Sequence, residues 1–167
     1  MLKWISKLSE LDIEQLMRVY SEGNLENGQE LFPEEDTPMQ LRLAEEQFIA
    51  YLREDFFQVS GAVYALWAPG DRYVSALRLE PYRDGLLLEA LETAPDERRK
   101  GYAFSLINAV LACLAATDCK RVYSHIHKRN IPSLQIHHKC GFQCVSDSAV
   151  YVDGTVTQNS YTLCYCL

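Results

Sequence analysis

The chain has 167 residues, of which 48% are hydrophobic and 23% are charged. This length and composition suit one folded domain over residues 1–167 and exclude a disordered chain. The formal net charge of -7 argues against general binding of nucleic acid, because neutralising phosphate groups needs clustered Lys and Arg.

Membrane and secretion signals are not expected in this sequence. No apolar stretch reaches the roughly 20 residues that a membrane crossing needs. The first residues, Met1–Lys7, lack the apolar core of a signal peptide. We therefore expect a cytoplasmic protein that does not bind membranes. The 6 cysteines include no CxxC pair and are expected to be free thiols.

The first third of the chain is predicted to be mainly helical. A short strand over Leu2 to Ser6 precedes a helix that Asp12 caps, with Gln15 completing a capping-box-like pair. The segment Glu22 to Asp36 is rich in Gly, Asn and Glu and is expected to form a loop. A second helix is predicted from a Thr37 cap to about residue 55.

Strand patterns dominate the middle of the chain. The runs Ala62 to Ala68 and Arg72 to Leu79 flank a Pro-Gly-Asp turn and predict an antiparallel hairpin. Further strands are expected over Leu86 to Thr93 and Arg121 to His127. The apolar residues between them, from Ala103 to Leu114, recur at helical spacing. Such a strand–helix–strand unit is normally parallel, with a right-handed crossover.

The last part of the chain is predicted to be a helix followed by a hairpin. Asn130 to Cys140 is expected to be helical, with Gly141 in the left-handed position that ends it. Phe142 to Leu167 is expected to form a β-hairpin around Asp153-Gly154. The complete order of elements predicts an α/β fold with a mixed sheet.

One segment carries a recognisable chemistry. After Thr93, a short turn leads into Arg98-Arg99-Lys100-Gly101-Tyr102-Ala103, which opens the long helix. The first N–H groups of a helix have no intrahelical partner, and the helix dipole favours a negative ligand there. Gly101 has no Cβ and lets a ligand approach the backbone closely. Together with three basic side chains, this geometry predicts a site for a pyrophosphate group.

The same segment resembles motif A of the GNAT N-acetyltransferase superfamily, whose signature is Gln/Arg-x-x-Gly-x-Gly/Ala. The run Asn130 to Phe142 is similar to the family's next motif, Asn-x-x-Ala-x-x-Leu-Tyr-x-Lys-x-Gly-Phe. The likeness in element order covers nearly the whole chain, although the N-terminal third matches only in outline. The resemblance implies a GNAT-like fold with a mixed, mostly antiparallel sheet, one parallel splayed strand pair, and helices on both faces.

The resemblance also implies an activity and a binding site. The chain would transfer the acetyl group of acetyl-CoA directly to a primary amine of a small molecule or peptide. The backbone amides of Arg98 to Ala103 would hold the CoA pyrophosphate. The strand end, Leu91 to Thr93, would bond the pantetheine arm, and Asn130 and Ser133 would contact the cofactor from the second helix.

Transfer needs a base for the amine and an acid for the departing thiolate. Glu89 and Glu92 are the candidate bases. On a regular strand they would point to opposite faces, so only one would face the substrate, whereas a bulge would change this parity. The Tyr that the family usually offers as acid is replaced by His137. Protonated His137 could act as the acid, neutral His137 could donate a hydrogen bond to sulfur, or the ring could simply pack near the cofactor.

Two other functions stay open at this point. The domain could bind acetyl-CoA or CoA without catalysis, as a sensor or interaction module. A metal-binding module could use His125, His127, Cys164 and Cys166, but a metal site needs three or four converging ligands, so no metal is expected. The acidic residues from Glu22 to Asp36 could simply be solvated in a loop, or they could border the acceptor site and favour a cationic amine. A homodimer is also an option.

Overall fold

The computed structural model describes residues 1–167, and its centre is a seven-stranded sheet of order β1-β2-β3-β4-β5-β9-β6. Only β4 (Gly85–Thr93) and β5 (Arg121–His127) are parallel neighbours, and the other neighbouring strands of this sheet are antiparallel. This arrangement confirms the predicted mixed, mostly antiparallel sheet. The other strands are β1 (Leu2–Ile5), β2 (Val63–Trp67), β3 (Ser75–Tyr82), β6 (Gln143–Ser146) and β9 (Ser160–Cys166).

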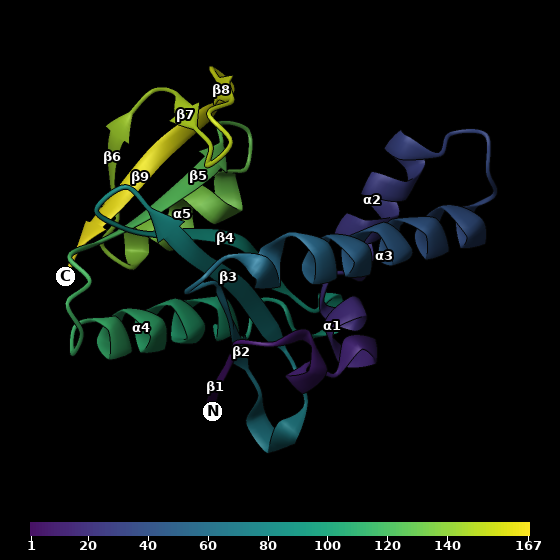
Figure 1. Cartoon of the computed structure of the whole chain (residues 1–167), viewed down its shortest axis with the longest axis horizontal. Coiled ribbons are helices and arrows are strands. Elements are labelled where there is room, and N and C mark those ends of the chain that lie inside the picture. The colour runs from purple at the N-terminus through teal and green to yellow at the C-terminus, as the bar shows by residue number, and fades with distance from the viewer.

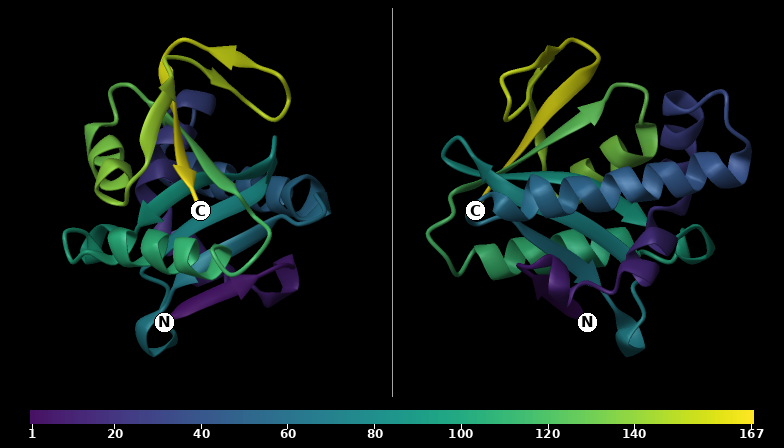
Figure 2. Two further views of the ribbon diagram at one scale, coloured as in Figure 1. Left: turned by 90° about the vertical axis from the view of Figure 1, so that its left-hand side faces the viewer. Right: turned by 45° about the vertical axis from the view of Figure 1, so that its right-hand side comes forward.

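Helices cover both faces of the sheet, as the resemblance implies (Figures 1 and 2). One face packs against the N-terminal helices through a core that includes Leu16, Leu52 and Tyr64. The other face packs against the later helices through Leu106 and Phe142. The helices are α1 (Ile13–Val19), α2 (Ser21–Leu31), α3 (Thr37–Glu54), α4 (Tyr102–Leu114) and α5 (Ile131–Lys139).

Helix α2 occupies much of the segment that was predicted to be a loop, so that prediction was wrong. Its Gly and Asn content disfavours a helix, but α2 packs along α3 and gains its stability from that contact. Gly28 makes the close approach possible, because a Cβ there would lie 2.4 Å from the Gln40 carbonyl oxygen. The Gln40 side chain donates a hydrogen bond to the Phe32 carbonyl at 3.1 Å, just beyond the end of α2.

The helix caps were predicted with mixed success. Asp12 caps α1 as expected, and its carboxylate accepts a hydrogen bond from the Gln15 N–H at 3.1 Å. The cap of α3 is Asp36 and not Thr37, because the Asp36 carboxylate accepts from the Met39 N–H at 3.0 Å. A carboxylate in this position accepts the hydrogen bond and also interacts favourably with the positive end of the helix dipole.

A bulge in β4 decides where its carboxylates point. Arg78 is opposite Glu89 and Ala76 is opposite Glu92, so two residues of β4 face one residue of β3 between them. Ala90, within the bulge, has a positive φ of 48°. Because residues opposite one another share a face, Glu89 and Glu92 lie on the same face as Arg78 and Ala76. The alternative that the sequence left open, a bulge that changes the parity of the strand, is therefore confirmed, and the two carboxylates do not point to opposite faces.

The parallel pair separates soon after it begins. β4 and β5 pair only from Leu86 to Leu88 and from Val122 to Ser124. Beyond that point β5 stays bonded to β9, while the β5-facing edge of β4 has no strand partner. The splayed pair implied by the resemblance is confirmed.

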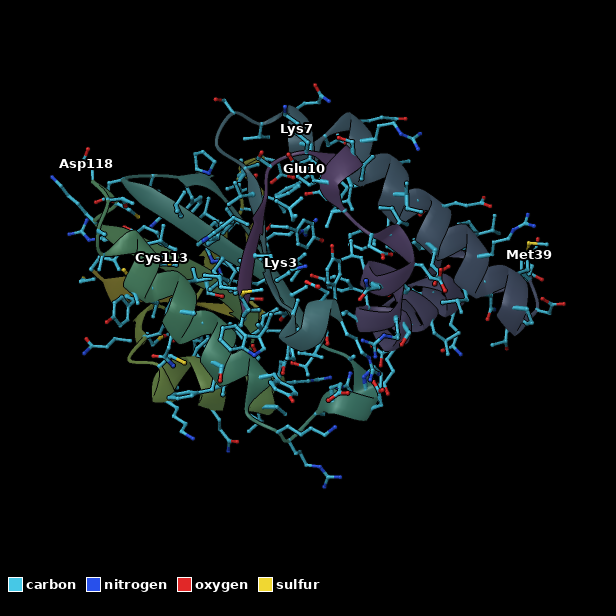
Figure 3. All side chains as sticks on the ribbon, turned by 90° about the horizontal axis from the view of Figure 1, so that it is seen from below. Lys3, Lys7, Glu10, Met39, Cys113 and Asp118 are labelled. Atoms are coloured by element: carbon cyan, nitrogen blue, oxygen red, sulfur yellow. The ribbon has the colours of Figure 1, made fainter.

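The C-terminal segment forms the expected hairpin with an addition at its tip. β6 and β9 pair antiparallel, and the segment between them contains a small separate pair, β7 (Ala149–Val150) with β8 (Val156–Thr157). All 6 cysteines are free, and Cys113 is exposed on α4 (Figure 3). No helix combines the length and apolar character that a bilayer crossing requires.

Candidate active site

The start of α4 has the strand–turn–helix geometry that the sequence predicted for a pyrophosphate site. This segment, residues 98–104, is called the cradle below. After β4 ends at Thr93, a short 3-10 turn over Pro95–Glu97 leads to Gly101, which has a φ of 82°. The first N–H group of this region to find an acceptor in the protein is that of Ser105, which donates to the Gly101 carbonyl at 3.0 Å. The N–H groups of residues 98–104 make no hydrogen bond within the chain. A row of unpaired donors at a helix N-terminus is suited to a phosphate group.

A cavity of about 670 Å³ lies over this cradle and gathers residues from β4, α4 and α5. Lys100 does not line it, although its ammonium group pairs at 2.7 Å with Glu97, which does. At the other wall, Asn130 caps α5 by accepting a hydrogen bond from the Ser133 N–H at 3.1 Å. The predicted binding residues that line the cavity are Leu91, Thr93, Arg98, Arg99, Gly101, Tyr102, Ala103, Asn130 and Ser133. The sequence interpretation missed four further lining residues: Glu97, Phe104, Pro132 and Ile136.

Arg98 links the cradle to the N-terminal helices. Its guanidinium group pairs with Glu22 on α2 and lies 3.7 Å from the Glu92 carboxylate. Its Nε also donates to the Thr93 carbonyl at 3.2 Å. Arg98 therefore joins the end of β4 to α2, which is far from β4 in the sequence. The contact with Glu22 could not be foreseen from a segment that was expected to be a loop.

Glu92 lies where three cavities meet. It lines the cradle cavity, a second cavity of about 480 Å³ that borders α2, α3 and β4, and a third of about 180 Å³ between the separated strands. Burial raises the pKa of Glu92, and the nearby charge of Arg98 opposes this shift. A carboxylate with a raised pKa is a better proton acceptor than an exposed one. Of the two candidate carboxylates, only that of Glu92 lines all three cavities.

Glu89 has a different environment on the same face. It lies 3.7 Å from Arg78, whose guanidinium group packs against the rings of Tyr51 and Phe56 at 4.9 Å and 5.3 Å. The neighbouring Glu80 is buried, and this burial together with the Glu89 charge raises its pKa to about 7. Glu89 therefore belongs to a charged cluster with Arg78 and Glu80. Neither partner was singled out from the sequence.

The geometry of His137 argues against its role as an acid. Its Nδ1–H donates to the Ser133 carbonyl at 2.8 Å, because a carbonyl oxygen can only accept. Nε2 therefore carries a lone pair, and it has no hydrogen-bond partner. The side chain is only 1% exposed, and burial lowers its pKa to about 4. His137 lines the cavity between the separated strands, but at neutral pH it has no Nε2 proton to donate.

The metal-binding alternative has no site in the structure. No group of three or more His, Cys, Asp or Glu side chains is arranged to hold a metal ion. The ring nitrogens of His125 are engaged by the Val150 carbonyl at 3.1 Å and by the Thr162 hydroxyl at 3.1 Å. The His127 ring accepts a hydrogen bond from the Arg129 N–H at 3.1 Å.

Comparison with known proteins identifies the fold and the family of the chain. The structure is similar to PaiA N-acetyltransferase from Thermoplasma acidophilum, solved with coenzyme A, with a TM-score of 0.67 and 12% identity over 100% of this chain and 99% of that one. An acetyltransferase from Streptococcus agalactiae 2603 gives a TM-score of 0.66 and 16% identity over 99% of this chain and 98% of that one.

A third similar structure is spermidine N-acetyltransferase from Vibrio cholerae, solved with CoA and spermine. Its TM-score is 0.63 with 13% identity, over 99% of this chain and 95% of that one. No curated protein matches the chain significantly. At these identities the solved structures establish a shared fold. The model of the acetyltransferase (GNAT) family matches residues 19–142, most of the sequence, and the chain belongs to this family.

Proposed function

We propose that the protein transfers the acetyl group of acetyl-CoA to a primary amine. The observation that carries this proposal is the junction at Glu92. A cavity with unpaired backbone donors for a diphosphate meets a second cavity there, and a carboxylate of raised pKa stands between them. An enzyme that joins the acetyl group of a nucleotide thioester to an amine needs a site for each of the two molecules and a base where the two sites meet.

The residues of the cradle fit the CoA group. The free N–H groups of residues 98–104 would hold the pyrophosphate, with the nearby Arg99 side chain adding positive charge. Beyond Leu88 the β5-facing edge of β4 is unpaired, so its backbone could bond the pantetheine amides as an added strand would. Asn130 and Ser133, at the start of α5, would contact the cofactor from the opposite wall.

The chemistry requires the amine to lose a proton. Acetyl-CoA, when bound, supplies an activated carbonyl carbon. Glu92 would take a proton from the substrate ammonium group, directly or through a water molecule, and leave a neutral amine. The amine nitrogen would then bond to the carbonyl carbon while the carbon–sulfur bond breaks, and the sulfur would leave with the electron pair. The nitrogen would lose its second proton to water, which balances the proton that the thiolate gains.

The departing sulfur does not depend on His137 in this scheme. A thiol has a pKa of about 8.5, so a thiolate is a tolerable leaving group and can take its proton from water. Glu89 is less suited than Glu92 to act as the base, because Glu92 lines both the cradle cavity and the second cavity, whereas Glu89 lines neither. The assignment therefore uses one protein group for proton transfer, Glu92, and uses the backbone for binding.

The test is release of free thiol from acetyl-CoA in the presence of a broad set of primary amines, with acetylated products identified by mass. We expect thiol release that depends on the amine, and its loss in the Glu92→Gln variant. The second candidate function, CoA binding without catalysis, is favoured by the absence of a proton donor at His137. Binding of CoA with no acetylated product from any amine would support that candidate and contradict the proposal.

A further inference from the structure

We infer that the acceptor is a small amine with a single positive charge and an apolar body, such as 2-phenylethylamine. This inference rests on the proposed function, because it assigns the cavity of about 480 Å³ to the amine. A volume of this size is in the range of small-ligand sites. The choice among amines follows from the walls of the cavity and from the position of its charges.

Six of the 13 residues that line the cavity are hydrophobic, and the uncharged polar side chains are those of Asn24, Asn27 and Gln47. Tyr20, Phe48 and Tyr51 present rings to the cavity, and Leu31, Ala44 and Ala90 add to the apolar surface. The Tyr20 and Phe48 rings pack edge to face with their centres 5.2 Å apart, which fixes this wall. The Tyr20 hydroxyl is already used, because it donates to the Ala90 carbonyl at 2.7 Å. The walls therefore favour an apolar body over a polar one.

The charges allow one ammonium group in the interior. Glu92 stands at the donor end of the cavity, where the reacting nitrogen must lie. The other lining carboxylate, Glu26, is exposed on α2. Arg78 adds a fixed positive charge to the lining, held against the Tyr51 and Phe56 rings. A second or third ammonium group of a polyamine would therefore have no carboxylate other than the exposed Glu26 to pair with, and Arg78 would repel it.

A carboxylate on the acceptor would also be poorly matched. Arg78 is the cation of the lining, but Glu89 already lies 3.7 Å from it. The Nε and Nη1 atoms of Arg78 are buried without hydrogen-bond partners, beneath the surface that a ligand could reach. Glu92 and Glu26 would repel the carboxylate of an amino acid. An uncharged apolar body avoids each of these costs.

The experiment compares three acceptors with the wild-type protein and saturating acetyl-CoA: 2-phenylethylamine, phenylalanine and spermidine. We expect kcat/KM for 2-phenylethylamine to exceed that for either of the others by about tenfold or more. Spermidine lacks the phenyl ring, whose burial is worth this much. Phenylalanine has the ring, but Glu92 and Glu26 would repel its carboxylate. Preference for spermidine or phenylalanine would overturn the inference and leave the proposed function intact. Failure of every amine would remove the proposed function and the inference with it.

A matched pair of variants tests whether the charge of the cavity wall sets this preference. Gln47 lines the cavity and is exposed, whereas Gln29 is exposed on α2 and does not line it. Gln47→Glu should raise kcat/KM for spermidine relative to 2-phenylethylamine by about threefold, the size expected for an exposed charge pair. Gln29→Glu should leave the ratio unchanged. An unchanged ratio in Gln47→Glu, or an equal shift in Gln29→Glu, would overturn the assignment of this cavity.

Discussion

Two glycines on α2 make the contact between α2 and α3 testable, because the same substitution should have opposite effects at each. A Cβ at Gly28 would lie 2.4 Å from the carbonyl oxygen and 2.7 Å from the carbonyl carbon of Gln40. These are backbone atoms, so one helix must move. A Cβ at Gly23 would meet nothing within 4 Å. Gly28→Ala therefore tests the packing, and Gly23→Ala serves as its control on the same helix.

The magnitudes follow from two opposing effects. Replacing a helical Gly by Ala stabilises by about 0.5 to 1 kcal/mol when there is room. Overpacking a close contact costs about 1 to 3 kcal/mol. We therefore expect Gly23→Ala to raise the free energy of unfolding by about 0.5 kcal/mol or more. Gly28→Ala should lower it by about 1 to 2 kcal/mol, equivalent to a fall in Tm of roughly 2 to 8 °C for a chain of this size.

Urea unfolding of the two variants and the wild type, followed by circular dichroism, measures both changes. Separation of α2 from α3 would also disturb the second cavity, which both helices line, so Gly28→Ala should raise the KM for the amine. If Gly28→Ala is as stable as Gly23→Ala, the close packing of α2 on α3 is refuted. The position of Glu22 beside Arg98 would then lose its support.

Three further predictions concern ionisable groups. Glu92→Gln should lower kcat by about a hundredfold or more, because the base is lost. The Kd for acetyl-CoA, measured by calorimetry, should stay near the wild-type value, because no binding group is lost. An equal loss of acetyl-CoA binding would contradict this role. His137→Gln should retain kcat within about fivefold between pH 6 and 8, and a hundredfold loss would restore the acid role. The pKa of Glu80 is raised from 4.5 to about 7, so the folded state holds this proton more tightly than the unfolded state. The free energy of unfolding should then fall as pH rises from about 4.5 through 7. Relative to the wild type, the free energy of unfolding of Glu80→Gln in urea should increase by about 1 to 2 kcal/mol between pH 5 and pH 8. An equal dependence on pH in both proteins would show that Glu80 is not the group responsible.

The cradle could be predicted because its chemistry lies in consecutive residues. Gly101 and the start of α4 follow a strand directly, and the unpaired N–H groups are a property of any helix start. The direction of the Lys100 side chain could not be predicted in the same way. It depends on Glu97, which the fold holds within reach of the ammonium group.

What could not be predicted depends on contacts between separate elements, which the local sequence does not determine. Local composition disfavours α2, and only its packing against α3 explains it. The bulge in β4 gives Ala90 a positive φ that nothing in the local sequence demands, and this bulge brings Glu89 and Glu92 to one face. The tautomer of His137 was in part foreseeable. Its acceptor, Ser133, lies four residues earlier on the same helix, but burial of the ring depends on the rest of the fold.

The most direct test of the central claim is a stoichiometric one. With acetyl-CoA and 2-phenylethylamine, mass spectrometry measures the acetylated amine while a thiol reagent measures free CoA. Acetyl transfer at the Glu92 junction predicts one acetylated amine for each thiol released, and loss of both in Glu92→Gln. Thiol release without acetylated amine, or CoA binding with neither product for any amine tested, would contradict it.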